Sequence, residues 1–212
     1  MPQSRQARRS ASPGRRGRVR VASREVAPMR VVGGSLRGRT LVTPSSPAIR
    51  PTSDRTREAV FNVLAHAREG GLSGLRVLDL FAGTGAQGIE ALSRGASACL
   101  FVEDAAEARG IIRDNIEAFG LTGVAKIFRR DATSLGAVGT IQPFDLVFAD
   151  PPYGKGLGEK ALSAALDGGW LNPGARVVLE EAASARFELP AGFVLADERE
   201  YGDTIIRFLD LA

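Results

Sequence analysis

The most constraining stretch of the sequence is residues 77–88, where an apolar run with one acid in its middle precedes closely spaced glycines. The run containing Asp79 has the length of a buried strand. Gly83 and Gly85 then indicate a tight turn, after which apolar residues return at helical spacing. This order brings main-chain N–H groups and a helix N-terminus close to a ligand, since glycine has no side chain in the way. We therefore expect a small, nucleotide-like ligand here.

Two classes of ligand compete for this loop. Gly83, Gly85 and Gly88 match the glycine fingerprint of dinucleotide-binding proteins, and Glu103 follows where a ribose-binding acid is expected. Asp79 favours a different ligand, because its carboxylate would repel a pyrophosphate and attract an ammonium group. S-adenosylmethionine (SAM) has an ammonium group, a sulfonium and a ribose but no phosphate, so SAM is the predicted cofactor. The alternative is that Asp79 only caps a turn.

The composition argues against several other kinds of site. A chain of 212 residues that is 44% hydrophobic suits one α/β domain with a substantial core. With only one histidine, His66, and one cysteine, Cys99, a zinc cluster or a Ser–His or Cys–His pair is not expected, and no metal is predicted. The lone thiol in an apolar strand indicates a reducing cytoplasm. No window approaches the roughly 18 apolar residues of a membrane span.

The positive charge of the chain is concentrated at its start. Residues 1–28 contain eight arginines and one acid, a charge of +7, whereas the other 20 basic and 23 acidic residues give −3. This Arg-rich tail has almost no large apolar side chain, so we expect it to be disordered. An organellar transit peptide is the rival interpretation, and translation starting at Met29 is another. If present, the tail would attract a polyanion such as RNA.

The region after the tail is predicted to form a β-hairpin at residues 30–43 and a helix at 54–67 with Ser53 as its N-cap. Arginines gather in both elements with few acids between them, which favours phosphate contacts as much as a solvated helix face. The predicted RNA-contacting residues are Arg37, Arg39, Arg50, Arg55 and Arg57.

From residue 76 onward, strand and helix patterns alternate. Strands are predicted at 76–81, 97–102, 124–128, 144–149, 175–180, 193–199 and 204–210. Helices are predicted at 86–94, 105–119 and 156–167, with a short helical turn near 132–137. These units imply a mostly parallel seven-stranded sheet covered on both faces. The turn Tyr201-Gly202-Asp203 indicates that the last two strands form an antiparallel hairpin.

Acids follow the ends of several predicted strands. Because ligands of parallel sheets bind outside the carboxyl ends of the strands, these side chains should meet at one edge. Glu103 can accept the ribose hydroxyls of SAM, with Asp104 as a less favoured alternative, and Asp131 can accept the adenine amino group. The predicted cofactor-binding residues are Asp79, Phe81, Gly83, Gly85, Glu103, Asp131 and Ala132.

The motif Asp150-Pro151-Pro152-Tyr153 is the most specific signal and is predicted to be catalytic. It is typical of methyltransferases that act on amino groups conjugated to a ring, whose delocalised lone pair is a poor nucleophile. A carboxylate and a backbone carbonyl that accept both amino hydrogens localise the lone pair toward the methyl group. The prolines stiffen the loop, and the Tyr153 ring offers a stacking face for a flipped base, a function that needs no hydroxyl. A structural Pro-Pro turn is the alternative.

With these motifs, the sequence resembles the bacterial 16S ribosomal RNA (guanine-N2)-methyltransferases. The resemblance rests on the stretches 31–39, 50–58, 79–85, 88–95, 150–153 and 201–204. It implies a Rossmann-like class I SAM-dependent methyltransferase fold in a single domain at 29–212, comprising the N-terminal hairpin and helix (29–70) and the catalytic core (75–212). It also implies a cytoplasmic enzyme, expected as a monomer, that methylates guanine N2 in the assembling small ribosomal subunit. Gln87, where an aliphatic residue is expected, and the long tail depart from the family.

Three alternatives remain open from the sequence. A DNA or protein amino-group methyltransferase shares the Pro-Pro-Tyr motif. A NAD-dependent oxidoreductase would use the glycine fingerprint, but Asp79 opposes it and no acid–base group for hydride transfer stands out. A ribosome-assembly protein with an inactive site would bind RNA without chemistry, which the intact Asp150 motif disfavours.

Overall fold

The computed structural model describes residues 28–44 and 53–212. The predicted tail at 1–28, except its last residue, and the predicted RNA contact Arg50 lie outside the described residues. Within the described part, no helix is long and apolar enough to cross a membrane.

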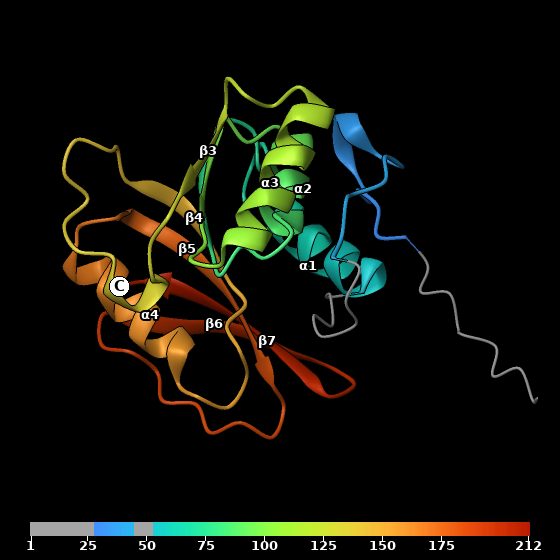
Figure 1. Cartoon of the computed structure of the whole chain (residues 1–212). Coiled ribbons are helices and arrows are strands. Elements are labelled where there is room, and N and C mark those ends of the chain that lie inside the picture. Colours follow the sequence, from blue (N-terminus) through green and yellow to red (C-terminus); the bar gives the residue numbers. More distant parts are fainter. Residues whose placement is uncertain (1–27, 45–52) are drawn as a thin grey trace, which may run out of the picture.

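The described chain is built on one seven-stranded sheet with the strand order β3-β2-β1-β4-β5-β7-β6 (Figure 1). The strands are β1 Arg76–Leu80, β2 Ala98–Val102, β3 Ala125–Phe128, β4 Phe144–Ala149, β5 Leu171–Ala182, β6 Phe193–Tyr201 and β7 Thr204–Leu211. The first five pair in parallel, whereas β7 runs antiparallel to both β5 and β6. The predicted Rossmann-like sheet with a C-terminal hairpin is therefore confirmed.

Strand β5 is longer at both ends than the predicted strand at 175–180. Its pairing with β4 shifts register between Phe144 and Leu146, so that Leu171 pairs with Phe144 and Arg176 with Leu146. Pro173 lies in this irregular part, where its lack of an N–H group costs no regular ladder bond. At the other end β5 continues to Ala182, paired with Thr204 of β7.

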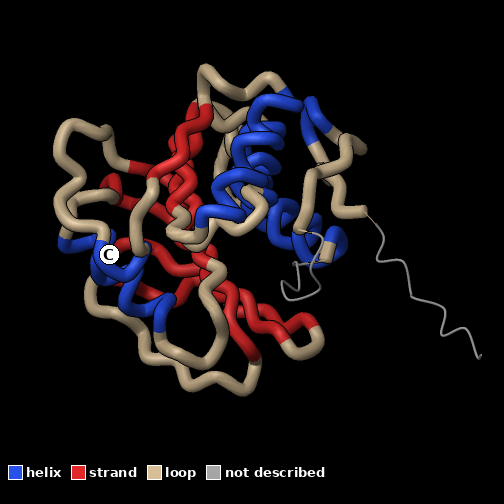
Figure 2. The backbone as a smooth tube through the Cα atoms, in the orientation of Figure 1, coloured by secondary structure: helices blue, strands red, loops and turns tan. Residues whose placement is uncertain are grey.

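Helices cover both faces of the sheet (Figure 2). The helices are α1 Asp54–His66, α2 Ala86–Ser93, α3 Ala106–Phe119 and α4 Leu157–Asp167, with the short 3-10 helices η1 Gly34–Leu36 and η2 Ala132–Ser134. One core cluster lies under α1, α2 and α3, and a second packs α4 and η2 against the other face. The predicted N-cap is confirmed, since Ser53 Oγ accepts a hydrogen bond from Thr56 N at 3.1 Å.

The N-terminal segment, residues 29–43, forms a single antiparallel bridge between Arg30 and Thr40 instead of the two predicted strands. Helix η1 occupies the bend, and the segment packs on α2 through a bond of 2.9 Å from Leu36 N to Ser93 Oγ. Three of its apolar side chains are buried in the core beneath α1 and α2. These core residues are Met29, Val31 and Leu41.

Helix α2 packs unusually close to β2. A Cβ added at Gly88 would lie 2.4 Å from the Phe101 ring and 2.5 Å from Cys99 Sγ, so only glycine fits there. This contact seals the Cys99 thiol in the core, where it is free and buried.

Candidate functional site

The register of the sheet brings four predicted strand ends together. Leu80 of β1 pairs with Val102 of β2 and Ala149 of β4, and Ala149 pairs in turn with Leu179 of β5. The residues that follow these four positions are Phe81, Glu103, Asp150 and Glu180. The glycine loop and the Asp150 loop therefore start side by side at the point where the strand order reverses, the usual place for a ligand in an open α/β sheet.

The glycine loop has a backbone that few residue types adopt. Gly83 has φ 56°, and Gly85, the N-cap of α2, has φ 78°. Phe81 has φ 57°, and among the described residues it is the one position other than glycine with a positive φ. Such a conformation costs about 1–3 kcal/mol and is concentrated at ligand sites.

The Glu103 carboxylate ties the loop to the end of β2. Its Oε2 accepts from Gly83 N and its Oε1 from Ala105 N, both at 2.9 Å. A carboxylate has about four acceptor positions, so these two bonds leave capacity for the hydroxyls of a ribose. The neighbouring Asp104 side chain is exposed, and no bond from it to the loop is described.

Asp79 lies beneath the loop with only 3% of its surface exposed. Its Oδ2 accepts from Gly88 N at 2.9 Å, so the carboxyl helps to hold the first turn of α2. Burial raises the pKa of Asp79 to about 8, partly opposed by the Gly88 bond and reinforced by the Glu103 charge. At neutral pH the carboxyl is then largely protonated. It would therefore repel the pyrophosphate of a dinucleotide less strongly than an ionised Asp79 would. Its contact with an ammonium group stays a prediction.

Asp131 and Ala132 follow β3 at the far side of the same edge. Asp131 is the exposed N-cap of η2, and its Oδ1 accepts from Thr133 N at 2.8 Å and from Thr133 Oγ1 at 2.7 Å. Both bonds use Oδ1, which leaves Oδ2 with its acceptor capacity, while Ala132 is buried. The acceptor oxygens of Glu103 and Asp131 therefore fit the ribose hydroxyls and the adenine amino group of SAM.

The Asp150 loop is held at two points beyond its prolines. Tyr153 Oη donates to Glu180 Oε1 at 2.7 Å, and Gly154 N donates to Glu181 Oε1 at 2.9 Å. Burial raises the pKa of Tyr153 well above its usual value, with further contributions from the charges of Glu180 and Asp150. Pro151 is buried, whereas the Tyr153 side chain stays 41% exposed and its ring remains accessible.

Sequence reasoning missed Glu180 and Glu181, which are both buried at the end of β5. The available signal was a pair of adjacent acids closing an apolar strand, in the same position as Glu103 after β2. The predicted strand ended at residue 180, and neither acid was assigned a role from the sequence.

The predicted arginines fall into different environments. Arg37 and Arg55 are exposed, as a phosphate contact requires. Arg39 is also exposed, but it donates to the carbonyl oxygen of Ala118 and lies over the Phe119 ring at 4.5 Å.

The prediction for Arg57 is wrong. Its side chain is 1% exposed and donates to the carbonyl oxygen of Arg30 and, at 2.7 Å, to Asp54 Oδ1. Its Nε lies 3.9 Å from Glu90 Oε2 in the core. Arg57 therefore joins the N-terminal segment to α1 and α2, and a phosphate cannot reach it.

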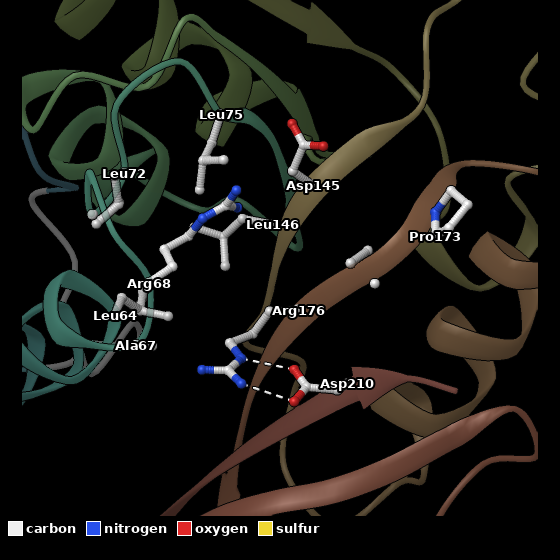
Figure 3. A pocket seen from close by; sticks show the side chains of 13 residues that line it. Leu64, Ala67, Arg68, Leu72, Leu75, Asp145, Leu146, Pro173, Arg176 and Asp210 are labelled. Atoms are coloured by element: carbon white, nitrogen blue, oxygen red, sulfur yellow. Dashed lines mark hydrogen bonds and ion pairs between the residues drawn. The ribbon is translucent and has the colours of Figure 1, made fainter.

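A cavity of about 490 Å³ lies at the opposite, amino-terminal edge of the parallel strands (Figure 3). Leucines from α1 and the loop before β1 line it together with Arg68, which points toward Leu146. Arg176 and Asp210 close one side through paired bonds of 2.7 and 2.8 Å. None of the predicted site residues that the structure describes lines this cavity, which is separate from the candidate site.

Comparison with known proteins agrees with this geometry. The family described as "Conserved hypothetical protein 95" matches residues 29–210. Ribosomal RNA small subunit methyltransferase D of Escherichia coli K12 is 38% identical over 182 residues, which cover 84% of this chain and 88% of that protein. The chain belongs to this family.

Other relatives support the same membership. A putative rRNA methyltransferase, YlbH of Bacillus subtilis, is 41% identical over 127 residues, covering 59% of this chain and 67% of the relative. The solved structure of the putative methyltransferase yhhF from Escherichia coli superposes with a TM-score of 0.74 at 31% identity. The superposition covers 87% of this chain and 98% of that chain.

Proposed function

We propose that the protein is a SAM-dependent methyltransferase that modifies the exocyclic N2 of a guanine in small-subunit ribosomal RNA. The observation that carries the proposal is the placement of the Asp150 loop beside the glycine loop, in a chain of this family. The relatives' names point to ribosomal RNA as the substrate. The amino-group motif points to a ring-conjugated amine, and guanine N2 is such a group.

The cofactor would lie over the carboxyl ends of β1, β2 and β3. Glu103 would accept the ribose hydroxyls, Asp131 the adenine amino group, and the loop from Phe81 to Gly85 would enclose the amino-acid end near Asp79. When bound, SAM supplies a methyl group on a sulfonium, an electrophile that needs no metal.

The catalytic work of the protein falls to the Asp150 loop. Asp150 and a loop carbonyl would accept the two amino hydrogens of the guanine, which localises the nitrogen lone pair. Tyr153 is 41% exposed, and its ring would stack on the base. Alignment of the two reacting groups would supply most of the acceleration, because the alkylated amine loses its extra proton readily.

The RNA would approach across the N-terminal elements, where Arg37 and Arg55 are exposed. Their charges suit the phosphates that flank a flipped base. We place the enzyme in the bacterial cytoplasm as a monomer acting on the assembling small subunit, with residues 29–212 as one domain.

The test is transfer of a labelled methyl group from SAM to small-subunit particles and to their naked RNA, followed by modified-nucleoside analysis. We expect N2-methylguanosine as the product. Label on adenine or on protein would instead favour one of the other amino-group methyltransferases.

Asp150→Ala should lower the transfer rate on the order of 10²–10⁴-fold, the range of a positioned acid–base group. SAM affinity should stay nearly unchanged, because this carboxylate acts on the nucleophile. Asp114→Ala, which alters an exposed aspartate of α3, is the matched control and should retain full activity.

A further inference from the structure

Two consecutive buried carboxylates stand at the carboxyl end of β5, directly beneath the Asp150 loop. Glu180 is 5% exposed and Glu181 is 4% exposed. Glu180 Oε1 accepts from Tyr153 Oη at 2.7 Å, and Glu181 Oε1 accepts from Gly154 N at 2.9 Å. Glu181 Oε1 also accepts from Ala182 N at 2.9 Å. One strand end thus holds a side chain and a main-chain amide from two successive loop residues.

The register of the sheet explains why these acids reach the loop. Ala149 pairs with Leu179, so Asp150 and Glu180 leave neighbouring strands at the same level. The chain then turns away from β4. The next hydrogen bonds that hold it are those of Tyr153 to Glu180 and of Gly154 to Glu181. Asp150 therefore lies between the end of β4 and the loop residues that are hydrogen-bonded to Glu180 and Glu181 of β5.

Burying a carboxylate is costly unless it accepts good hydrogen bonds, and bonds to an ionised acceptor are shorter and stronger than neutral ones. The ion pairs described for the chain do not include Glu181, so its observed bonds go to main-chain N–H groups. The Glu180 and Glu181 side chains thus both bond to the Asp150 loop.

We propose that Glu180 and Glu181 are positioning residues that fix the Asp150 loop for attack by the substrate amine, and that the Tyr153 hydroxyl is the handle that Glu180 holds. This inference rests on the proposed function. It also changes the interpretation of Tyr153, whose hydroxyl had no role in the sequence analysis. The ring stacks on the base, and the hydroxyl sets the angle at which the ring is presented.

The first test removes each partner of the Tyr153 bond. Tyr153→Phe and Glu180→Leu should each lower the single-turnover rate at saturating substrate about tenfold, since a small misplacement at a reacting centre costs up to about 100-fold. SAM affinity should not change. The double variant should be no slower than Tyr153→Phe, because both changes remove the Tyr153–Glu180 bond and only Tyr153→Phe also removes the bond with Thr204. Rate losses that multiply would overturn the coupling of the two residues.

The second test separates the Glu181 acceptor from its charge. Glu181→Gln keeps an oxygen that can accept from Gly154 N and should retain most of the rate, whereas Glu181→Leu should lose about tenfold. Hydrogen exchange of the peptide spanning residues 151–156 should be faster in Glu181→Leu and unchanged in Glu181→Gln. This readout needs neither SAM nor RNA.

Glu188→Ala is the control, because Glu188 is an exposed acid whose described ion pair is with Arg186, also exposed. It should change neither the exchange nor the rate. Wild-type protein without methyl transfer would contradict the proposed function, while the exchange data would still report whether the anchors hold the loop. If the wild type is active and the folded variants at Tyr153, Glu180 and Glu181 keep its transfer rate and its hydrogen exchange, the inference is overturned.

Discussion

Buried carboxylates occur in two regions of the molecule, and their partners differ. In the first region, Glu90 of α2 is fully buried between two arginines, with Arg94 Nε at 2.7 Å and Arg57 Nε at 3.9 Å. It also accepts from Val32 N at 2.8 Å. This cluster joins the N-terminal segment to the helices and carries its own counter-charges.

In the second region, at the carboxyl edge of the sheet, the carboxylates accept instead from main-chain N–H groups. Asp79, Glu103 and Glu181 all do so, and none of the three appears in the ion pairs described for the chain. The buried carboxylate that serves the fold is paired with arginines, whereas the carboxyls at the edge where a ligand would bind accept hydrogen bonds from the main chain. This difference in partners distinguishes the carboxyl edge of the sheet from the rest of the molecule independently of the sequence motifs.

The comparison predicts its largest effect on stability for Glu90→Ala. Removing Glu90 takes the described carboxylate partner from Arg94 and one of two from the buried Arg57, so unfolding in urea should show a loss of about 3–5 kcal/mol. Glu117→Ala, an exposed glutamate of α3, should change stability by less than about 0.5 kcal/mol. Similar losses in both variants would show that Glu90 is not a structural charge.

Glu103→Ala should act on binding. Loss of its acceptors should weaken SAM binding by about 1–3 kcal/mol, measured by titration calorimetry. Glu103→Gln, which keeps one acceptor oxygen, should lose less, and Asp104→Ala should lose almost nothing because its exposed side chain has no described bond to the loop. A larger loss for Asp104→Ala would move the ribose contact to that residue.

Asp79→Asn should alter the pH dependence of stability. The pKa of Asp79 is about 8 in the fold against a usual 3.8, so between these values the folded protein holds a proton that the unfolded chain has released. The free energy of unfolding should then fall as pH rises through this window, by up to about 1.4 kcal/mol per pH unit. Asn removes that contribution and keeps an acceptor for Gly88 N. The free energy of unfolding is measured in urea at several pH values for the wild type and for Asp79→Asn. If the carboxyl were ionised in the fold, this free energy would change with pH in the same way in both proteins.

Gln87→Leu should give the smallest effect, and in the stabilising direction. Gln87 Oε1 is buried with no hydrogen-bond partner among the described residues. An aliphatic side chain removes this unsatisfied acceptor and should raise the free energy of unfolding by about 1 kcal/mol, visible as a higher Tm. A lower Tm would mean that the amide is satisfied in solution.

Much of the fold and of the site edge followed from the sequence, because both depend on local patterns. Alternating strand and helix signals imply a parallel sheet, and such a sheet brings the residues after its strands to one edge whatever the details of packing. That reasoning alone places Glu103 and Asp150 at the same edge, and in the structure their strands, β2 and β4, lie on either side of β1.

The errors have a common physical cause, since each concerns a partner far away in the chain. Arg57 was read as an exposed charge because two of its contacts, with the carbonyl oxygen of Arg30 and with Glu90, lie 27 and 33 positions away. Glu181 was missed because it contacts a loop 27 positions earlier. The predicted hairpin is reduced to one bridge and three main-chain bonds, and its bend contacts Ser93 of α2, 57 positions later.

The seal between Gly88 and Cys99 provides a natural reporter of motion at the loop. Cys99 is the only cysteine of the chain, and burial together with the Asp79 charge raises its pKa, so the closed protein should resist thiol reagents. The thiol becomes accessible when α2 lifts from β2, and α2 begins at the glycine loop. The rate of Cys99 alkylation should therefore measure opening of that helix, and a ligand that closes the loop should slow it.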